Sequence, residues 1–592
     1  MEQFLIENKQ IFDTAIQVIE ILIALYVVYA SIRAKQANLL FRVLAPVFAV
    51  GGTGLLTYFE HTHEQSESSV LLLSDELSLI MLCIVIGVGG LITLYAFPYM
   101  RDYKHHHPEV KSSYILFFSV IIIFLIAMCG LVTSDNMIWI FFFWEITSLC
   151  SFLLIGWTKT KEAVNNSFRA LAINLSGGLA FAAAIVLIAS KFDTLSLTVF
   201  LEKSSENPES LTVSVAAGLL CFAALTKSAQ LPFHSWLLGA MVAPTPTSAL
   251  LHSATMVKAG VYLVIRLAPI LGATVVGYSV TVIAGLTFLV TSIIAITQFD
   301  GKRILAYSTV ANLGLMLACA SIGTPESLWA AIFLLIFHAV SKSLLFLCVG
   351  ATEHKIGNRN VEHMGQLLST CKPLAICMLI GIAGMFLAPF GMLISKWAAM
   401  KAFVDSDNLL IIMILVYGSA ATLFYWTKWM GKIVQGSNNA EKTTQKLALL
   451  EGSSIYVHAI LVTLACFGFP YASKYLVVPY LDNLFGEGAT AVISGGNVTL
   501  MLVMLSLLLI LPLSFVIMSK KDNRKQALVY MSGENIGDNS HFYGAMDSAQ
   551  ENKLRNWYMQ DEFSEKRFTL YGNLIVVGIM LCTVVMLLGG GF

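Results

Sequence analysis

Seven ionisable side chains lie inside strongly apolar stretches of this sequence, where an ionised group is costly. They are one carboxylate, four lysines and two histidines: Glu145, Lys227, Lys258, Lys342, Lys396, His252 and His338. At the centre of a membrane each charged residue costs roughly 2.5–3.5 kcal/mol on insertion scales, so such residues are usually functional. Desolvation disfavours the ammonium form of a lysine, and a nearby carboxylate restores it. Moving a carboxylate or its partner would therefore switch a buried lysine between loading and releasing a proton.

The competing interpretation is that these long side chains snorkel to the membrane surface from helix ends. Snorkelling is easiest for Lys258, about a third of the way along its predicted span. Lys227 and Lys342 are well inside apolar sequence, and the side chain of Glu145 is too short to reach far. The pattern therefore favours ionisable groups that act inside the membrane.

The histidines also admit two interpretations, because a lone histidine in an apolar helix is more often a hydrogen-bonded core residue than a relay member. His338 and Lys342 are four residues apart and share one helix face, which favours a relay. His252 and Lys258 are six residues apart and do not share a face of a straight helix, so the link between them is weaker.

Two of the lysines stand next to helix-breaking residues. Lys227 is followed by Pro232 and by the turn-rich stretch APTPTS at 243–248, and Lys396 is preceded by LAPFG. Paired broken helices in the two halves of a chain point to the binding site of a transporter.

The elements that must position these residues are membrane helices. About 16 segments are long and apolar enough to span the hydrocarbon. They are residues 14–33, 38–58, 77–99, 113–132, 135–157, 168–190, 211–231, 247–268, 272–298, 302–321, 326–350, 371–403, 408–430, 451–473, 497–518 and 569–590. Spans four to eight hold the first break and spans nine to thirteen the second. Because each group has an odd number of helices, the two groups run in opposite senses.

The sequence therefore predicts an all-α polytopic membrane protein with two inverted five-helix repeats and broken helices. Residues 1–112 hold the three N-terminal helices, 113–270 the first repeat, 271–432 the second repeat, and 433–592 the last three helices with a polar loop at 518–568. The second half of that loop, 546–567, is compatible with a surface helix.

Basic residues alternate between the predicted loops, as the positive-inside rule requires. The basic loops lie near 33–35, 101–111, 159–161, 302–303, 355–359, 428–446 and 520–525. Loops at 61–69, 133–135 and 323–326 are nearly free of bases. We therefore expect the chain to lie in a prokaryotic cytoplasmic membrane, with the 518–568 loop in the cytoplasm and both termini outside.

Composition excludes several other functions. The 592 residues are 57% hydrophobic and 12% charged, and acids and bases balance at 36 each, so nothing indicates nucleic-acid binding. The ten cysteines are scattered without the close spacing of iron–sulfur or structural zinc sites. No Walker or dinucleotide-binding motif is found. We expect no cofactor and no metal in this chain, and we identify no catalytic residue. We expect that the N-terminal stretch is not a removable signal peptide, because it lacks a basic region and a small-residue cleavage site.

Five stretches resemble the antiporter-like subunits of respiratory complex I and of Mrp cation antiporters. They are WEITSLCSFLLIGW, TKSAQLPFHSWL, APTPTSALLHSATMVKAGVYLV, KRILAYSTVANLG and FHAVSKSLLFLCVGA, within roughly residues 75–430. The resemblance implies that Glu145 is the fifth-helix glutamate at a subunit interface and that Lys227 is its lysine partner. It places Lys396 at the end of the path, and it assigns the central relay to four residues: His252, Lys258, His338 and Lys342.

Two further motifs, GMFLAPFGMLISKWAAMKA and MSGEN at 531–535, are similar to the large membrane subunit of Ech-type energy-converting hydrogenases. This similarity implies a proton- or sodium-translocating, non-redox subunit of a ferredoxin-linked oxidoreductase. Its partners would be other membrane subunits, including a quinone-site-like subunit on the helix-five side, and hydrogenase large, small and ferredoxin-type subunits. The NiFe centre and iron–sulfur clusters would lie in those partners.

Other interpretations remain open. The chain is also compatible with the large subunit of a Mrp-type cation/proton antiporter or with an L-type subunit of a complex I-like oxidoreductase. It is also compatible with a structural anchor whose buried charges have no function. The sequence does not distinguish H⁺ from Na⁺.

Overall fold

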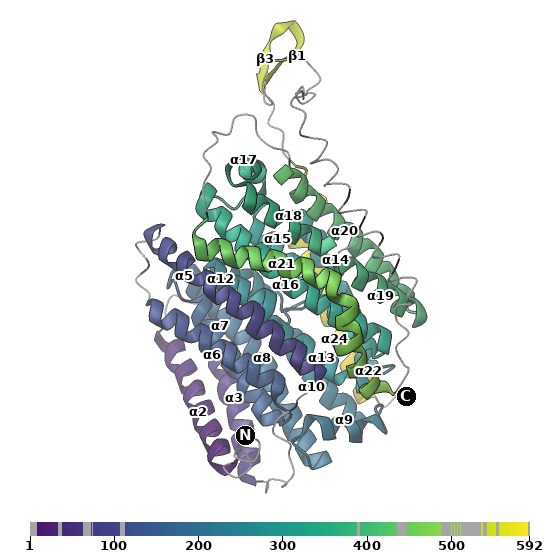
Figure 1. The fold of residues 1–592 in the computed structure, drawn as a ribbon. Helices are drawn as coiled ribbons and strands as arrows, with labels where there is room; N and C mark the ends of the chain where they lie inside the picture. Colours follow the sequence, from purple (N-terminus) through teal and green to yellow (C-terminus); the bar gives the residue numbers. More distant parts are fainter. Residues whose placement is uncertain are drawn as a thin grey trace.

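The computed structural model describes residues 9–33, 38–62, 75–106, 113–386, 391–434, 447–486, 534–536, 541–551 and 556–589, with a few single positions outside these ranges. Nearly all of this part of the chain is helical, and the helices pack side by side (Figure 1). Twelve of the described helices are long and apolar enough to cross a membrane. The prediction of an all-α polytopic membrane protein is therefore confirmed.

The N-terminal part and the first five-span group contain most of the predicted helices at the predicted places. The N-terminal part comprises α2 (Lys9–Arg33), α3 (Leu39–Thr62), α4 (Glu76–Leu82), the π-helix η1 (Cys83–Val88) and α5 (Gly89–His106). The first group comprises α6 (Tyr114–Thr133), α7 (Met137–Ile155), α8 (Lys161–Phe192), α9 (Leu197–Ser205), α10 (Leu211–Lys227), α11 (Ser235–Gly239), the 3₁₀ helix η2 (Ala240–Val242), α12 (Thr245–Ala249), the π-helix η3 (Leu250–Ala254) and α13 (Met256–Leu271).

The second group and the C-terminal part continue in the same way. The second group comprises α14 (Val275–Ile296), α15 (Gly301–Ile322), α16 (Pro325–Ile356), the 3₁₀ helix η4 (Val361–Gln366), α17 (Leu367–Thr370), α18 (Lys372–Phe386), α19 (Gly391–Asp405) and α20 (Leu409–Val434). The C-terminal part comprises α21 (Leu449–Ala472), the π-helix η5 (Ser473–Val477), α22 (Val478–Phe485), β1 (Glu534–Asn535), β2 (His541–Tyr543), the 3₁₀ helix η6 (Ala545–Asp547), β3 (Ala549–Glu551) and α24 (Glu565–Leu588). The predicted span 497–518 lies outside the described residues, and the division into domains stays a prediction.

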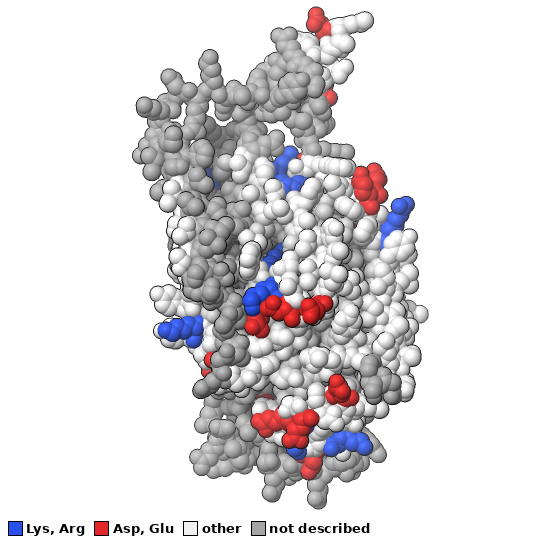
Figure 2. All heavy atoms as spheres, turned by 90° about the vertical axis from the view of Figure 1, so that its right-hand side faces the viewer, with Lys and Arg blue, Asp and Glu red and all other residues white. Residues whose placement is uncertain are grey.

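The centre of the molecule is formed by helices that are apolar on every side. In the most apolar 18-residue stretch of each helix, all residues of α15 and 94% of those of α16 are buried. In α24 only 11% of these residues are buried. A helix that is hydrophobic all round requires either a protein core or lipid around it. On the face shown in Figure 2, uncharged atoms dominate and the charged residues are few and clustered, as expected for a surface that contacts lipid.

Among the described residues, the predicted basic loops at 302–303 and 355–359 and the start of the one at 428–446 lie at one end of the helices. Ion pairs join them there: Arg359 Nε to Asp300 Oδ2 at 2.6 Å, and Lys432 Nζ to Glu362 Oε2 at 2.8 Å. The Tyr558 hydroxyl, which follows the C-terminal strands, donates to Glu362 Oε1 at 2.6 Å. These contacts bring the α20 end, the loop before α15 and the C-terminal segment to the same end.

The base-poor loops at 133–135 and 323–326 have other neighbours. The amide of Leu73 donates to the Thr133 carbonyl at 2.7 Å, and Asn136 forms an isolated β-bridge with Ser196. The carbonyl of Ile322 lies 3.3 Å from the point where a Cβ on Gly272 would be. The loops at 133–135 and 323–326 thus pack against neighbours that the basic loops do not contact, which agrees with the predicted alternation.

The expectation of a surface helix over 546–567 is wrong. Its described part contains the end of η6, strand β3 and irregular chain, and regular helix begins only at Glu565. β3 is an edge strand of a three-stranded antiparallel sheet in the order β1–β2–β3. Figure 1 shows the strands projecting beyond the helices. Met546, Asp547 and Met559 have positive φ values of 58°, 53° and 47°, a backbone conformation that interrupts a right-handed helix.

Helix breaks occur beside two of the buried lysines. α10 ends at Lys227, and the chain then passes through Ala229 at φ 52° before α11 begins. A second break was not predicted: η3 ends at Ala254, and the next residue, Thr255, has a φ of −131° and a ψ of −101° that separate η3 from α13. The stretch 243–248, expected to be a turn, contributes instead to the short helix α12. The LAPF part of the predicted break before Lys396 lies outside the described residues.

Candidate functional site

The two five-span groups meet at a contact between a lysine and a histidine. The Nζ of Lys258 on α13 lies 3.3 Å from Nδ1 of His338 on α16, and both residues are fully buried. The same ammonium donates to the carbonyl of Ser253. That carbonyl is available because the helix breaks at Thr255, so the break itself supplies a ligand for the lysine.

Lys227 is held at the end of α10 by groups on α7. Its Nζ donates to the Trp144 carbonyl at 2.9 Å and to Ser148 Oγ at 2.7 Å, and lies 4.8 Å from the centre of the Trp144 ring. These contacts satisfy the ammonium in a site that excludes water. No hydrogen bond between Lys227 and Glu145 is present, although the two were expected to form a pair.

Glu145 projects from α7 toward α8. It is 7% exposed, and neither carboxylate oxygen has a hydrogen-bond partner among the described residues. Gly178 makes room for it, since a Cβ at this position would overlap Oε1 of Glu145. An unpartnered buried carboxylate is costly, which indicates that this group binds something that the protein alone does not provide.

Lys342 reaches a different helix from its neighbour His338. Its Nζ donates to the Leu305 carbonyl at 3.0 Å and to Ser308 Oγ, both on α15, and lies 5.1 Å from the Trp426 ring. The two residues share a helix face as predicted, yet their polar atoms point to separate partners. His338 therefore faces the first group of spans and Lys342 stays within the second.

The two remaining predicted residues, His252 and Lys396, have fewer contacts. The His252 ring lies 5.9 Å from the ring of Trp236 and 6.2 Å from that of Phe346, and neither of its nitrogens has a hydrogen-bond partner among the described residues. Lys396 on α19 is 7% exposed, with its Nζ 5.7 Å from the Phe288 ring. The structure thus brings Lys258 and His338 together and places the other predicted residues in separate buried sites.

Two buried carboxylates in helices were missed from the sequence. Glu20 on α2 is 5% exposed and lines the same small cavity as Glu145. Glu451 on α21 is 3% exposed. Both are single acidic residues in or beside an apolar run, which is the signal that identified Glu145.

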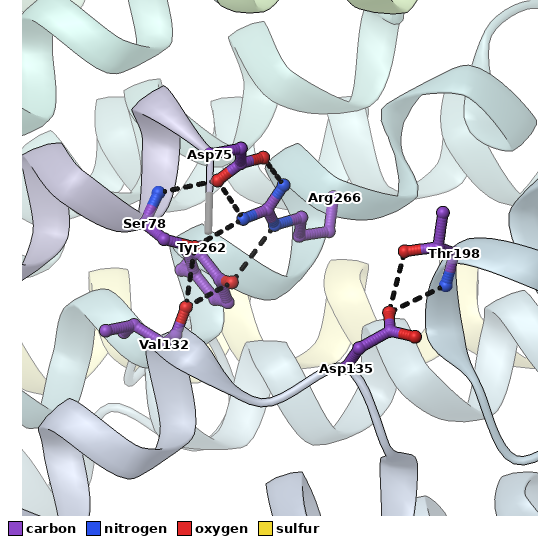
Figure 3. Close-up of polar contacts among 7 residues, drawn as sticks. All are labelled: Asp75, Ser78, Val132, Asp135, Thr198, Tyr262 and Arg266. Carbon is purple, nitrogen blue, oxygen red and sulfur yellow. Dashed lines mark hydrogen bonds and ion pairs between the residues drawn. The ribbon is translucent and has the colours of Figure 1, made fainter. Parts of the chain in front are cut away.

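A third missed feature is an ion pair where α13 meets the start of α4 (Figure 3). Both terminal nitrogens of Arg266 donate to Asp75, one of them at 2.7 Å, and Nε donates to the Tyr262 hydroxyl at 3.0 Å. Tyr262 in turn donates to the Val132 carbonyl at 2.9 Å. Lys258, Tyr262 and Arg266 are spaced four residues apart along α13, so they share one face.

The Asp75–Arg266 pair is mainly structural. Burial raises the pKa of Asp75, but the hydrogen bond and charge of Arg266 outweigh this effect and leave the pKa below its usual range. Removing one partner of a buried pair costs roughly 3–5 kcal/mol. Nearby, Asp135 accepts hydrogen bonds from the amide and hydroxyl of Thr198, at 3.0 and 2.7 Å (Figure 3). These contacts fix the ends of α6, α9 and α13.

Metal and cofactor binding have little support. Among the described residues, no group of three or more His, Cys, Asp or Glu side chains is arranged to hold a metal ion. The expectation that this chain has no metal or cofactor stays a prediction.

Comparison with known proteins gives two family profiles. Residues 134–422 match "NADH:quinone oxidoreductase/Mrp antiporter, TM", and residues 63–108 match "NADH-Ubiquinone oxidoreductase (complex I), chain 5 N-terminus". Together the two matches cover more than half of the sequence and include all seven predicted site residues.

Curated relatives include the Na(+)/H(+) antiporter subunit A1 of Staphylococcus aureus strain MRSA252, 35% identical over 418 residues. The same subunit of strain bovine RF122 / ET3-1 is 34% identical. Each alignment covers 66% of this chain and 51% of the relative. The chain thus spans about half the length of the curated relatives it matches.

Two solved structures share the fold. The Mrp complex from Dietzia sp. DQ12-45-1b aligns with a TM-score of 0.62 and 25% identity, covering 85% of this chain and 56% of that one. The membrane-bound sulfane sulfur reductase, an archaeal respiratory membrane complex, aligns with a TM-score of 0.62 and 18% identity, covering 79% and 97%. The second likeness concerns the fold alone.

Proposed function

Because the chain belongs to the family of antiporter-like membrane subunits shared by NADH:quinone oxidoreductase and Mrp antiporters, we propose that it translocates a monovalent cation, H⁺ or Na⁺, through its buried lysines and histidines. The observation that carries the proposal is the contact between Lys258 Nζ and His338 Nδ1, 3.3 Å apart, which joins the two five-span groups at a fully buried point.

The proposed mechanism is electrostatic. Glu145 and Lys227 form the entry, Lys258 with His338 and His252 the centre, and Lys342 the continuation toward Lys396. At about 8 Å and an effective dielectric near 20, one unit charge changes the energy of another by roughly 2 kcal/mol. That energy is about 1.5 pKa units, enough to favour loading of one site and release from the next. Three of the lysines on this path, Lys227, Lys258 and Lys342, already have protein ligands for their ammonium groups.

The entry pair provides the test of this proposal. Glu145→Gln and Lys227→Ala are each expected to reduce ion translocation strongly while the electron-transfer or exchange partners remain assembled. If the two residues act as a unit, the double variant loses little more than either single variant. The measurement is gradient formation in proteoliposomes, normalised to the amount of assembled complex. Full translocation in either variant contradicts the relay, and strictly additive losses contradict the pairing.

For the complex type, we propose an Ech-type energy-converting hydrogenase, in which electron transfer in partner subunits drives the ion. The two motifs at 384–402 and 531–535 support this assignment. Identity of 35% to a Na(+)/H(+) antiporter subunit A1 favours the alternative, a Mrp-type antiporter. Copurification with a nickel and iron–sulfur protein supports the first, and copurification with small membrane subunits free of iron and nickel supports the second.

The proposed orientation places both termini outside the cytoplasmic membrane and the C-terminal sheet in the cytoplasm. Met546, between β2 and β3, is fully exposed, so we use Met546→Cys as the reporter. A membrane-impermeant maleimide is expected to label this variant in inverted vesicles and not in intact cells, relative to the unsubstituted chain with its natural cysteines. Labelling in intact cells would reverse the orientation.

A further inference from the structure

A small cavity lies beside Glu145, between α2, α3, α7 and α8. Its volume is about 20 Å³, which is room for about one water molecule or one small ion. Two carboxylates line it, Glu145 from α7 and Glu20 from α2. Apart from Thr53, the other lining residues are apolar. Figure 1 shows α2 and α3 side by side at the edge of the molecule.

The carboxylates are well removed from solvent. Glu20 is 5% exposed and Glu145 is 7% exposed. The neighbouring cation does not neutralise Glu145 by contact, because the ammonium of Lys227 is bonded to the Trp144 carbonyl and to Ser148 Oγ. Both oxygens of Glu145 lack a hydrogen-bond partner among the described residues. The carboxylate is therefore turned toward the cavity rather than toward a side chain that would satisfy it.

The surrounding packing favours this arrangement. α2 and α3 join α7 and α8 through an apolar cluster that is separate from the main core and includes Ala24, Ala49 and Leu175. These three residues also line the cavity. On α8, Gly178 lacks the Cβ that would collide with the Glu145 carboxylate. The apolar cluster forms a cavity wall without polar groups, and the missing Cβ of Gly178 leaves space for the Glu145 carboxylate.

An ionised Glu145 carboxylate is not solvated in this small apolar cavity, and an ionised Glu20 carboxylate that lines the same cavity repels it. One cation resolves the conflict. A shared proton leaves one carboxyl neutral, as in other carboxylate pairs, and a dehydrated Na⁺ accepts oxygen ligands from both. A hydrated divalent ion is too large for the volume.

We propose that Glu20 and Glu145 form a binding site for a single dehydrated monovalent cation, H⁺ or Na⁺, at the start of the relay. The proposal adds the Glu20 carboxylate to the entry of the relay. Glu20 lies on α2, a helix that carries none of the site residues predicted from the sequence. It rests on the proposed function only in taking the bound cation to be the transported one.

The experiment measures binding without transport. Membranes containing the full chain are treated with dicyclohexylcarbodiimide, which modifies protonated carboxyl groups in apolar surroundings, and labelling of Glu145 is quantified by mass spectrometry. The series covers a range of pH values, with NaCl or choline chloride. Glu20→Gln is the test variant. Glu451→Gln is the matched control, because Glu451 is also a buried carboxylate on a membrane helix.

If Na⁺ is the occupant, NaCl protects Glu145 in the natural protein and in the Glu451→Gln control, while choline chloride does not. In the Glu20→Gln variant, the same protection of Glu145 then requires a Na⁺ concentration at least about tenfold higher. If the occupant is H⁺, the two salts behave alike, and Glu20→Gln moves the half-labelling pH down by about one unit, a tenfold change in proton concentration. Either result supports the site and identifies its ion.

The proposal is overturned if Glu20→Gln labels like the natural protein in both series, or if Glu145 is not labelled at any pH. Labelling requires no ion gradient and no turnover. A protein that shows Glu20-dependent labelling but no translocation would therefore contradict the proposed function and support the site. A protein that translocates ions but shows no Glu20-dependent labelling would support the proposed function and contradict the site.

Discussion

Lys258→Met is expected to abolish ion translocation while the chain still folds and assembles. The initial rate in proteoliposomes should fall about 100-fold or more, because a positioned proton-transfer group typically contributes that much. Lys258 contacts both His338 and the free carbonyl of Ser253, where the helix breaks. Among the described residues, no other hydrogen bond links the relay residues of one five-span group to those of the other, so a methionine would interrupt the path at its centre.

Folding should survive this change, since methionine has a similar length and removes a buried charge rather than creating one. Lys191→Met is the matched control, because Lys191 lies at the exposed end of α8. The measurements are complex recovery by size-exclusion chromatography and gradient formation by the same preparation. Translocation at the natural rate by Lys258→Met would remove this residue from the path and leave its burial to a structural explanation.

Burial of the lysines was predictable from the sequence, because a charged residue in the middle of an apolar run of membrane length must lie inside the membrane or the protein. The hydrogen-bond partners of the lysines were not predictable. The spacing of His338 and Lys342 correctly places them on one face of α16, but His338 contacts a lysine 80 residues away and Lys342 contacts α15. Spacing rules describe one helix, whereas the choice of partner depends on how helices cross.

The environment of Glu145 shows the same limit. The apolar sequence around it predicts burial, and the family resemblance predicts a pair with Lys227. In the structure Lys227 is bonded to backbone and hydroxyl groups of α7, and Glu145 faces a cavity shared with Glu20. Glu20 is 125 residues earlier in the chain, and only the packing of α2 on the α7–α8 pair brings it near.

Helix breaks were predicted where proline marks them and missed where it does not. Pro232 follows the end of α10, as expected. The break at Thr255 lies within an apolar stretch without proline or glycine at that position, where a π-helix ends. Such π segments often mark functional sites, and this one exposes the carbonyl that Lys258 uses.

Lys396→Ala is expected to leave assembly intact and to lower the ion gradient that the complex can build. Lys396 is buried on α19 beside the Phe288 ring, and in sequence it is the predicted relay residue farthest from Glu145. Moving one charge against about 150 mV costs roughly 3.5 kcal/mol, so the far end of the path must resist back-flow of that size. A fixed ammonium there repels a returning cation, and alanine removes that barrier.

Lys396→Arg should also fail, for the opposite reason. Arginine keeps the positive charge but stays protonated, so it repels a returning cation yet cannot release a proton. Lys401→Ala is the matched control, because Lys401 lies on the same helix, is 44% exposed and pairs with Asp405 at 3.1 Å.

The measurement compares gradient size with turnover in one proteoliposome preparation. Natural stoichiometry in both Lys396 variants would show that this lysine only snorkels and that the exit lies elsewhere. A low gradient at normal turnover in the alanine variant, together with little translocation in the arginine variant, would place the exit at Lys396, because no purely structural role predicts that a neutral and a positively charged substitution fail in these different ways.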